Sequence, residues 1–339
     1  MTGLVIGLAA AGTAAAADLE WNALPALPNQ EGFSGMFAGT SGGALLAAGG
    51  TNFPSKKPWE GGSKAYYDTV YVLDGPNGTW QFAGKLPRPL GYGASVETPS
   101  GVLCIGGATE MEHHTECFLL EYRDGKLSTR PFPPLPRPCA NLCAASVDST
   151  VYVAGGLETP SSTEAMKTFW SLDLQSPEHG WRELPACPGP ARILAVAAGF
   201  NDAFYLLSGA SLSAGPDGKP VRTYLRDAWR FTPTNGWERL PDLPRAAVAA
   251  PSPAPVNDGQ IEVLGGDDGS LATFEPKALH PGFPKRRMEF DATRKLWTEA
   301  DGMPCAPVTC PVAAWLGGFV LVGGEVRPGV RTHDVWKVR

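Results

Sequence analysis

The sequence predicts an all-β fold, a six-bladed kelch-type β-propeller, and three observations support this prediction. The 339 residues include 41 glycines and 33 prolines without a Gly-X-Y period, which is typical of many short strands and turns. Aromatic residues make up 9% and charged residues 18%, which disfavours both a disordered chain and a charged helical bundle. An apolar run that ends in Gly-Gly or Ser-Gly recurs six times, at intervals of 49 to 58 residues. That interval is near the kelch period of about 50 residues.

Each repeat predicts four strands, a to d, in a constant order. Strand a follows a proline-rich turn, and strand b is the apolar run. The b strands end at Gly50, Gly107, Gly156, Gly209, Gly266 and Gly324. The c strands are aromatic and β-branched runs over residues 69–74, 117–122, 168–174, 227–231, 286–291 and 333–338. In four copies the d strand carries a tryptophan: Trp80, Trp181, Trp237 and Trp297. One such blade cannot bury both of its faces, whereas blades packed around an axis bury each other.

The two ends of the chain are predicted to complete one blade. The sixth repeat stops at Arg339, just after its c strand, and lacks a tryptophan-bearing d strand. Residues 18–24 have the composition of a d strand followed by its proline turn. We expect them to complete the blade begun by residues 308–338, which closes the ring and removes a free sheet edge. Residues 18–339 are therefore predicted to form one propeller domain.

Residues 1–17 are predicted to be a signal-peptide remnant or a flexible tail. Leu4 to Ala11 form a short apolar run, and the small residues Ala14 to Ala17 precede Asp18. This pattern is typical of the end of a secretory signal, and it is too short to span a bilayer. No basic residue precedes the run, so the unprocessed tail remains an alternative. We expect a periplasmic or secreted protein, or a cytoplasmic one if the segment is no signal.

The charge and the metal-binding residue types argue against several classes of partner. The formal net charge of −6 disfavours nucleic acid and anionic membranes. The seven cysteines show no CxxC spacing and no histidine at zinc-ligand distance, so most are expected to be buried apolar residues. A disulfide between Cys104 and Cys117 is an open alternative. The cluster Glu110, Glu112, His113, His114 and Glu116 is interpreted as a solvated loop, and no metal site is predicted.

Four arginines occupy equivalent positions in the repeats. Because strand a runs away from the d–a turn and strand b returns, the b–c loops and the d–a turns share one face of a propeller. The arginines that precede strand a are Arg88, Arg137, Arg192 and Arg245. We expect them to converge near the axis, where guanidinium groups suit a carboxylate ligand. The alternative is that they stack on the Trp and Pro of neighbouring turns and hold the blades together.

The last b–c loop carries the strongest candidate for chemistry. It reads GEVRPGVRT over residues 324–332. Glu325 directly follows the double glycine, which places it at the mouth of the channel, and the Pro328-Gly329 turn can bring Arg331 back towards it. A carboxylate beside an arginine stays ionised near neutral pH and can act as a base or an acceptor. A structural ion pair that fixes the loop is the alternative.

Four segments resemble a known family: residues 32–39, 49–73, 86–95 and 324–332. They are similar to the N-acetylneuraminate (sialic acid) epimerases, or mutarotases, which are six-bladed kelch-like propellers of the bacterial periplasm. In better-known members the Glu-Arg segment lies mid-chain, whereas here it lies at the C-terminus. The chain therefore resembles a cyclically permuted branch, and a closed ring tolerates such a change of termini. The resemblance implies that Glu325 and Arg331 are active-site residues.

The resemblance implies an isomerase that opens and recloses the ring of a small acidic sugar. Glu325 is the predicted general base, and Arg331 is the predicted carboxylate clamp or ring-oxygen electrophile. The further predicted substrate-binding residues are Arg88, Arg137, Arg192, Arg245, Arg327, Asn52 and Lys64. No metal or organic cofactor is predicted. The loop after Gly209 has Ala210 where the family acid would stand, and the fifth loop also diverges, so sugar contacts there are expected to differ.

Two other functions remain open. The first is a non-catalytic kelch propeller that binds an acidic glycan or a protein partner in the same funnel. The second is a copper radical oxidase, which is disfavoured because no Tyr/His ligand set stands out among five histidines. The sequence does not decide between a monomer and a homodimer.

Overall fold

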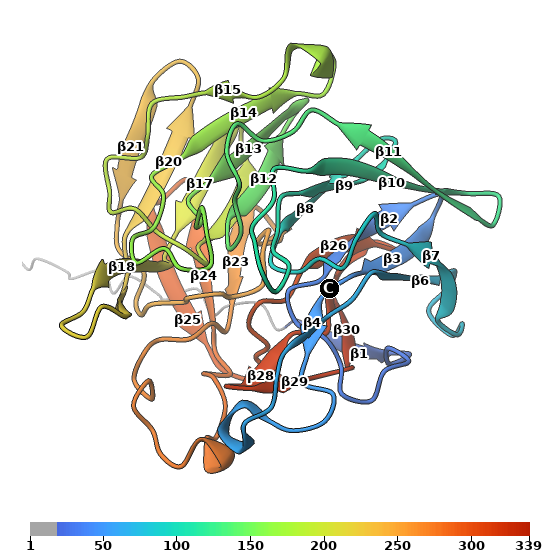
Figure 1. Cartoon of the computed structure of the whole chain (residues 1–339). Coiled ribbons are helices and arrows are strands. Elements are labelled where there is room, and N and C mark those ends of the chain that lie inside the picture. Colours follow the sequence, from blue (N-terminus) through green and yellow to red (C-terminus); the bar gives the residue numbers. More distant parts are fainter. Residues whose placement is uncertain (1–18) are drawn as a thin grey trace, which may run out of the picture.

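The computed structural model describes residues 19–339, which form six four-stranded antiparallel sheets arranged around an axis (Figure 1). Each sheet is one blade, and blades 1 to 6 follow chain order. The predicted β-propeller is therefore confirmed. The predicted signal segment, residues 1–17, lies outside the described residues.

The strands lie where the repeats predict them. The a strands, nearest the axis, are β2 (Phe37–Ser41), β8 (Ala94–Thr98), β12 (Cys143–Val147), β16 (Val196–Phe200), β22 (Val256–Asn257) and β26 (Val312–Trp315). The b strands are β3 (Ala44–Ala48), β9 (Gly101–Ile105), β13 (Thr150–Ala154), β17 (Ala203–Leu207), β23 (Gln260–Leu264) and β27 (Gly318–Val322). The c strands are β6 (Thr69–Leu73), β10 (Cys117–Arg123), β14 (Phe169–Asp173), β20 (Ala228–Thr232), β24 (Arg287–Asp291) and β30 (Val335–Val338). The d strands are β7 (Gln81–Lys85), β11 (Lys126–Phe132), β15 (Arg182–Glu183), β21 (Gly236–Leu240), β25 (Leu296–Ala300) and β1 (Trp21–Leu24).

The first strand of the chain closes the ring, as predicted. Strand β1 pairs antiparallel with β30, with Trp21 opposite Val338 and Leu24 opposite Val335. Blade 6 thus has the order β1-β30-β27-β26, with one strand from one end of the described chain and three from the other. This pairing covers the outer edge of β30, which would otherwise be free to pair with another chain.

The tryptophans of the d strands join neighbouring blades. Each indole Nε1–H donates to a carbonyl in the proline turn that follows the d strand of the preceding blade. The pairs are Trp80 to Pro25 (2.7 Å), Trp181 to Pro133 (2.9 Å), Trp237 to Pro185 (2.8 Å) and Trp297 to Pro241 (3.0 Å). The Trp-to-proline-turn pattern of the sequence is thus a contact between blades, because a partly buried indole N–H needs an acceptor.

The double glycine that ends each b strand adopts positive φ. In blade 3, Gly155 and Gly156 have φ of 66° and 106°, and a Cβ on Gly156 would lie 2.3 Å from the Cys139 sulfur. Backbone conformation and close packing therefore both require glycine at the second position. Blade 4 has Ser208 at the first position, with φ of 54°.

Six backbone hydrogen bonds form a closed ring around the axis. One residue ahead of each a strand, two or three positions before it in five blades and seven in blade 5, donates its N–H to the carbonyl of the equivalent residue in the preceding blade, at 2.7 to 2.9 Å. These residues, the axial ring, are Gly35, Tyr92, Asn141, Leu194, Ala249 and Thr309. All six have positive φ, although five are not glycine. Since left-handed backbone costs roughly 1–2 kcal/mol per residue, the ring is maintained against local strain.

The hydrophobic core lies between neighbouring blades, and it accounts for the cysteines. Cys104 pairs with Phe118, whereas Cys117 pairs with Ile105, so the two thiols lie on opposite faces of blade 2. Cys104 packs with residues of blade 1 and Cys117 with residues of blade 3. The alternative of a disulfide between them is therefore wrong. All seven thiols are free, and burial raises the pKa of Cys117 to about 12.

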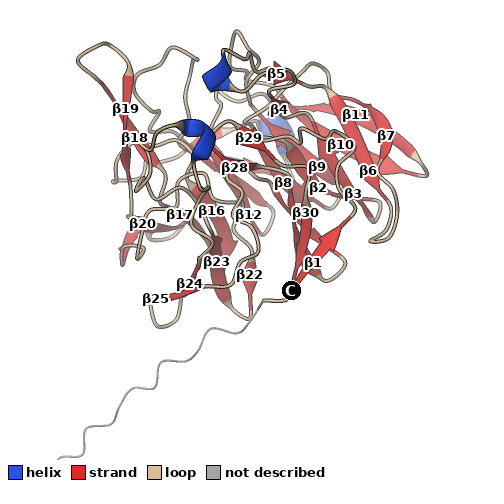
Figure 2. Ribbon diagram, turned by 90° about the horizontal axis from the view of Figure 1, so that it is seen from below, coloured by secondary structure: helices blue, strands red, loops and turns tan. Residues whose placement is uncertain are grey.

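The b–c loops carry additional structure on one face, which we call the loop face. Three small hairpins lie there: β4 (Thr51–Asn52) with β5 (Ala65–Tyr66), β18 (Ala210–Ala214) with β19 (Pro220–Tyr224), and β28 (Glu325–Arg327) with β29 (Val330–Arg331). The short 3-10 helices are η1 (Pro58–Glu60), η2 (Pro177–His179) and η3 (Lys277–Leu279). Figure 2 shows the three hairpins on the side opposite the C-terminus.

Candidate functional site

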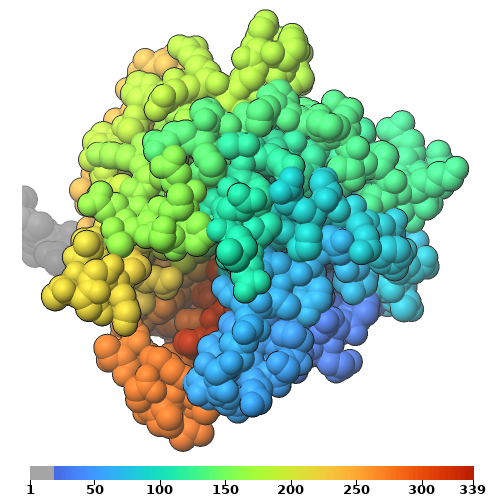
Figure 3. Space-filling view, in the orientation of Figure 1, coloured from blue at the N-terminus to red at the C-terminus, as the bar shows by residue number. Residues whose placement is uncertain are grey.

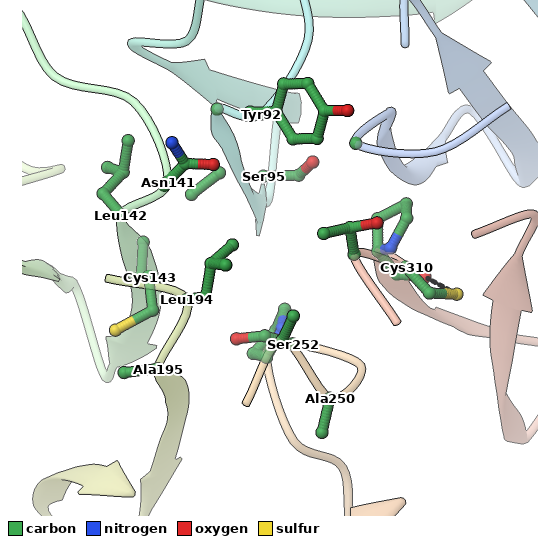
Figure 4. Close-up of a pocket in the computed structure, with 18 of the residues that line it drawn as sticks. Tyr92, Ser95, Asn141, Leu142, Cys143, Leu194, Ala195, Ala250, Ser252 and Cys310 are labelled. Carbon is green, nitrogen blue, oxygen red and sulfur yellow. Dashed lines mark hydrogen bonds between the residues drawn. The ribbon is translucent and has the colours of Figure 1, made fainter. Parts of the chain in front are cut away.

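A cavity of about 470 Å³ opens on the loop face. Residues of the b–c loops form its walls, and five side chains of the axial ring form its floor: Tyr92, Asn141, Leu194, Ala249 and Thr309. Figure 3 looks onto this face, and the C-terminal residues, in red, lie at the base of a hollow between the blue, yellow and orange loops. Beyond the floor a smaller hollow of about 70 Å³ continues along the axis, and Figure 4 shows Tyr92, Asn141 and Leu194 around it.

Glu325 and Arg331 lie side by side in the wall of this cavity. They are cross-strand partners in the β28–β29 hairpin, and Arg331 Nη1 donates to Glu325 Oε2 at 2.6 Å. The second oxygen, Oε1, accepts a hydrogen bond from the Gly329 N–H at 3.0 Å. The expected position at the channel mouth is therefore correct. The turn at Pro328-Gly329 brings the two charges together, as the sequence indicates.

The guanidinium of Arg331 is held on several sides but keeps an unused donor. The side chain is only 4% exposed, and its guanidinium carbon lies 4.7 Å from the centre of the Phe53 ring. Nη2 donates to the Tyr92 hydroxyl at 3.3 Å. Nε has no hydrogen-bond partner within residues 19–339. A buried donor without a partner is costly, which points to a ligand oxygen at this position.

Tyr92 is one of three polar residues at the floor of the cavity, together with Asn141 and Thr309. Its hydroxyl lies 2.9 Å from Thr51 Oγ1, and Lys64 Nζ lies 4.7 Å from the centre of its ring. Burial disfavours the phenolate, but Lys64, Arg331 and the Thr51 hydrogen bond favour it, and together they lower the pKa of Tyr92 below its usual value. Neighbouring Tyr66 shows the opposite shift, because burial and nearby Tyr92 and Glu110 raise its pKa to about 12.

The structure does not bring the four turn arginines to the axis, so that expectation is wrong. None of them lines the cavity. Arg88 pairs with Glu116 at 2.8 Å, and Arg137 makes a two-point pair with Glu158. Both acids lie in the b–c loop of the same blade. Each of these partly exposed arginines therefore links a d–a turn to a b–c loop, and the glutamate of the pair neutralises its positive charge.

Arg192 is buried and Arg245 is largely buried, and each also pairs with an acid. Arg192 donates to both oxygens of Asp227, at 2.9 and 2.6 Å, and to the Ser208 carbonyl. Arg245 pairs with Glu299 at 3.2 Å and donates to backbone carbonyls. The structural alternative is thus closer to the observed geometry, although the partners are acids and carbonyls instead of Trp and Pro.

The three other predicted binding residues differ in position. Lys64 lines the cavity. Asn52 is fully buried behind it, where its amide donates to the Gly32 carbonyl and accepts from the Tyr67 hydroxyl. Arg327 points away and donates to the Ala278 carbonyl at 2.8 Å. Neither Asn52 nor Arg327 lines the cavity.

Two charged residues of the cavity wall were not predicted from the sequence. Arg222 and Asp267, from the loops of blades 4 and 5, line the cavity. The hydroxyl of Tyr224 donates to Asp267 Oδ2 at 3.1 Å. These residues belong to the two loops that diverge from the family pattern, which is why the comparison of motifs did not identify them.

The histidine-containing loop is solvated only in part. Glu110 and Glu112 are exposed, as expected, whereas His113 and His114 are 9% and 7% exposed. His113 lines the cavity, and its Nδ1–H donates to the Leu157 carbonyl at 2.9 Å, while burial lowers its pKa. Within residues 19–339, no group of three or more His, Cys, Asp or Glu residues is placed to hold a metal ion. No helix in that range has the length and apolar character needed to cross a bilayer.

Comparison with known proteins identifies the family. The profile of the N-acetylneuraminate epimerase family matches residues 2–129 and 132–275. The chain belongs to the N-acetylneuraminate epimerase family. The matched residues end before the β28–β29 hairpin, which is what a cyclic permutation predicts, because its counterpart would lie elsewhere in the family order. The permutation itself stays a prediction.

Curated relatives match over part of their length. A protein of Brucella suis named N-acetylneuraminate epimerase is 41% identical over 107 residues, which are 29% of this chain and 27% of the relative. A Haemophilus influenzae protein of the same name is 42% identical over 106 residues, 27% of this chain and 28% of the relative. A Yersinia pestis protein of that name is 38% identical over 127 residues, 32% of this chain and 31% of the relative. Each match thus spans about a third of the relative or less.

A solved structure supports the fold over the whole ring. The structure titled "Structure of YjhT" superposes with a TM-score of 0.67 and covers 92% of this chain and 96% of that chain. The sequence identity is 14%, so this likeness concerns the fold.

Proposed function

We propose that this protein interconverts the anomers of N-acetylneuraminate, or of a closely related acidic sugar, by opening and reclosing the pyranose ring. One observation carries the proposal: the Glu325–Arg331 pair lines a cavity, and Arg331 keeps a buried donor without a partner. Membership of the N-acetylneuraminate epimerase family supports the substrate class. The cavity volume of about 470 Å³ lies in the usual range for small-molecule sites.

The charges of the cavity favour a small carboxylic acid. Lys64, Arg222 and Arg331 line it together with two carboxylates, those of Glu325 and Asp267. Three cations against two acids leave room for one more negative charge. A carboxylate can accept two hydrogen bonds from a guanidinium, and Arg331 is the buried guanidinium with an unused donor.

The closeness of the pair fits the chemistry at the anomeric carbon. In an acidic sugar of this class one carbon carries both the carboxylate and the anomeric hydroxyl. A clamp for the carboxylate and a base for the hydroxyl must therefore be neighbours, and Arg331 Nη1 lies 2.6 Å from Glu325 Oε2. Arg331 holds the carboxylate, and Glu325 removes the proton of the hydroxyl, which starts ring opening.

Exchange NMR on N-acetylneuraminate at anomeric equilibrium tests the proposal. Wild-type protein is expected to accelerate the interconversion of the two anomers above the spontaneous rate. Glu325→Gln keeps the shape but removes the base, so the protein-dependent rate is expected to fall at least about 100-fold. The matched control is Glu158→Gln, because Glu158 also pairs with an arginine on the loop face but lies outside the cavity.

Two outcomes would contradict the proposal. Equal acceleration by wild type and Glu325→Gln would remove Glu325 from the chemistry. Tight binding of the sugar by wild type without faster exchange would support the non-catalytic binding propeller instead.

We also propose that the protein is exported, on the basis of the apolar and small-residue pattern in residues 1–17. The measurement is the N-terminal sequence of the protein recovered from each cell fraction. Processing near Ala17 in the periplasmic fraction supports export, and an intact Met1 in the cytoplasm contradicts it.

A further inference from the structure

Ring opening needs a proton donor as well as a base. When the bond from the anomeric carbon to the ring oxygen breaks, that oxygen becomes an alkoxide unless an acid protonates it. Arg331 cannot supply the proton, because a guanidinium does not deprotonate in proteins. The other acids that line the cavity are Tyr66, Tyr92, Lys64 and His113.

Tyr92 is positioned best among these groups. Its hydroxyl lies 3.3 Å from Arg331 Nη2, so it is on the same side of the cavity as the Glu325–Arg331 pair. Arg331 donates to the phenol oxygen, and Thr51 Oγ1 at 2.9 Å can also donate to it. A phenol that accepts two such bonds is well placed to release its own proton, because both bonds stabilise the phenolate.

The backbone holds Tyr92 in a fixed position. Tyr92 is a member of the axial ring: its N–H donates to the Gly35 carbonyl, and its carbonyl accepts from Asn141, both at 2.8 Å. Its φ of 61° is costly for a tyrosine, and the four other non-glycine members of the ring share this conformation, so the ring as a whole maintains it. The ring aims the Tyr92 side chain towards the loop-face cavity, where both Tyr92 and Arg331 line the wall.

The charged groups around Tyr92 favour its ionisation, unlike those around Tyr66. Lys64 and Arg331 lie close to Tyr92 and lower its pKa against the effects of burial and of Glu325. Tyr66 lies with its ring centre 6.4 Å from that of Tyr92, yet its pKa is raised to about 12. Two phenols in one cavity whose pKa values shift in opposite directions indicate different roles.

We propose that Tyr92 is the catalytic acid that protonates the ring oxygen of the sugar while Glu325 deprotonates the anomeric hydroxyl. This inference deepens the proposed function and rests on it. The motivating geometry is the hydroxyl of Tyr92 bonded to Arg331 and Thr51 at the floor of the cavity.

Ring opening transfers two protons. Glu325 takes the proton of the anomeric hydroxyl, and the electron pair of that O–H bond becomes the second C–O bond of a ketone. The bond between the anomeric carbon and the ring oxygen breaks, its electron pair goes to the ring oxygen, and that oxygen takes the proton of Tyr92. The products are the open-chain keto acid, a neutral Glu325 carboxyl and the Tyr92 phenolate.

Reclosure reverses the two transfers. After rotation about the bond next to the ketone, the chain hydroxyl attacks the opposite face of the ketone. The Tyr92 phenolate takes the proton of that hydroxyl, and Glu325 returns its proton to the ketone oxygen. The enzyme groups regain their starting states, and the sugar is the other anomer.

Tyr92→Phe removes the acid and leaves the ring in place. We expect the protein-dependent exchange rate at saturating sugar to fall about 100-fold or more, with little change in sugar affinity. Tyr66→Phe is the matched variant in the same cavity, and its loss is expected to be at least about tenfold smaller. Ultraviolet titration is expected to lose a tyrosine of lowered pKa in Tyr92→Phe and to keep it in Tyr66→Phe.

The pH profile separates a chemical role from a structural one. As pH rises, Tyr92 loses its proton and the exchange rate, corrected for the spontaneous reaction, is expected to fall. Lys64→Met removes a cation that favours the phenolate, so this alkaline limb is expected to move to higher pH. The limb is expected to be absent in Tyr92→Phe.

The outcomes distinguish this inference from the proposed function. An inactive wild-type protein overturns both. An active wild type with Tyr92→Phe losing no more than Tyr66→Phe overturns the role of Tyr92 alone. An alkaline limb that Lys64→Met leaves in place also overturns it.

Discussion

The buried pair of Arg192 and Asp227 allows a sharp test of what the turn arginines do. The Arg192 side chain is 2% exposed and that of Asp227 is 10% exposed, whereas the Arg137 side chain is 56% exposed. We compare Arg192→Met with Arg137→Met. Both substitutions remove one arginine from an equivalent turn, and they differ in the burial of the acid that is left behind.

The structure sets the expected magnitudes. Removing one partner of a buried ion pair costs about 3–5 kcal/mol, because the other charge stays buried. Asp227 keeps a hydrogen bond from Trp229 Nε1 at 2.6 Å, which places the expected loss for Arg192→Met near the lower limit, about 3 kcal/mol. Arg137→Met breaks an exposed pair and is expected to cost less than about 1 kcal/mol.

Urea unfolding of the two variants and of wild type measures these losses at neutral pH. Burial raises the pKa of Asp227, but the hydrogen bonds from Arg192 and Trp229 outweigh burial and lower it. The pair therefore stabilises the folded state fully at a pH above the usual carboxyl pKa range, and this stabilisation is lost as the pH falls through that range and below it. The loss in Arg192→Met is therefore expected to shrink as the pH falls into that range. Equal losses in both variants, or a selective loss of sugar affinity in Arg192→Met with unchanged stability, would refute a structural role.

Two further predictions concern blades 5 and 3. Burial, together with Glu289 and Asp258, raises the pKa of Glu262 to about 8 against the opposing effect of Arg287. The folded state therefore binds a proton that the unfolded state releases above about pH 4.5, so the free energy of unfolding falls as the pH rises from 6 to 8, by at most about 1.4 kcal/mol per unit. Urea unfolding of Glu262→Gln is expected to show a flatter profile, and an unchanged slope would contradict the assignment. Gly156→Ala places a Cβ 2.3 Å from the Cys139 sulfur, whereas Gly125→Ala, also at positive φ, meets nothing within 4 Å. Gly156→Ala is expected to be about 1–3 kcal/mol less stable than Gly125→Ala in thermal unfolding, and equal stability would mean that the close packing is relaxed at little cost.

The fold was predictable because its signals are local and repeated. Each double glycine marks the end of a b strand. Blade 6 has no residues for a d strand after its c strand, so residues 18–24 were assigned to it, and the pairing of β1 with β30 follows from this assignment. The β4–β5 and β18–β19 hairpins on the loop face were not predicted, because their short strands lie in segments without a repeated pattern.

The site was predictable only in part, for a physical reason. Glu325 and Arg331 are six residues apart, and a turn between them fixes their contact. The arginines of the turns pair with acids that lie 21 to 54 residues further along the chain, as in the pairs with Glu158 and Glu299. A pattern that repeats only the arginine does not show its partner.

Tyr92 was missed although a signal for it exists in the sequence. It occupies the position just before strand a that Asn141, Leu194, Ala249 and Thr309 occupy in other repeats. An alignment of the repeats at this position shows a tyrosine among smaller side chains. Its importance depends on the axial ring, which joins residues about 50 apart in sequence and has no local signature.

The most direct test of the account compares two substrates with the same anomeric centre. Exchange NMR with wild-type protein measures the interconversion of N-acetylneuraminate and of its methyl ester, which lacks the negative charge. If the buried guanidinium of Arg331 holds the carboxylate beside the base, the protein-dependent kcat/KM is expected to fall at least about tenfold for the ester. Equal acceleration of both sugars would contradict the account.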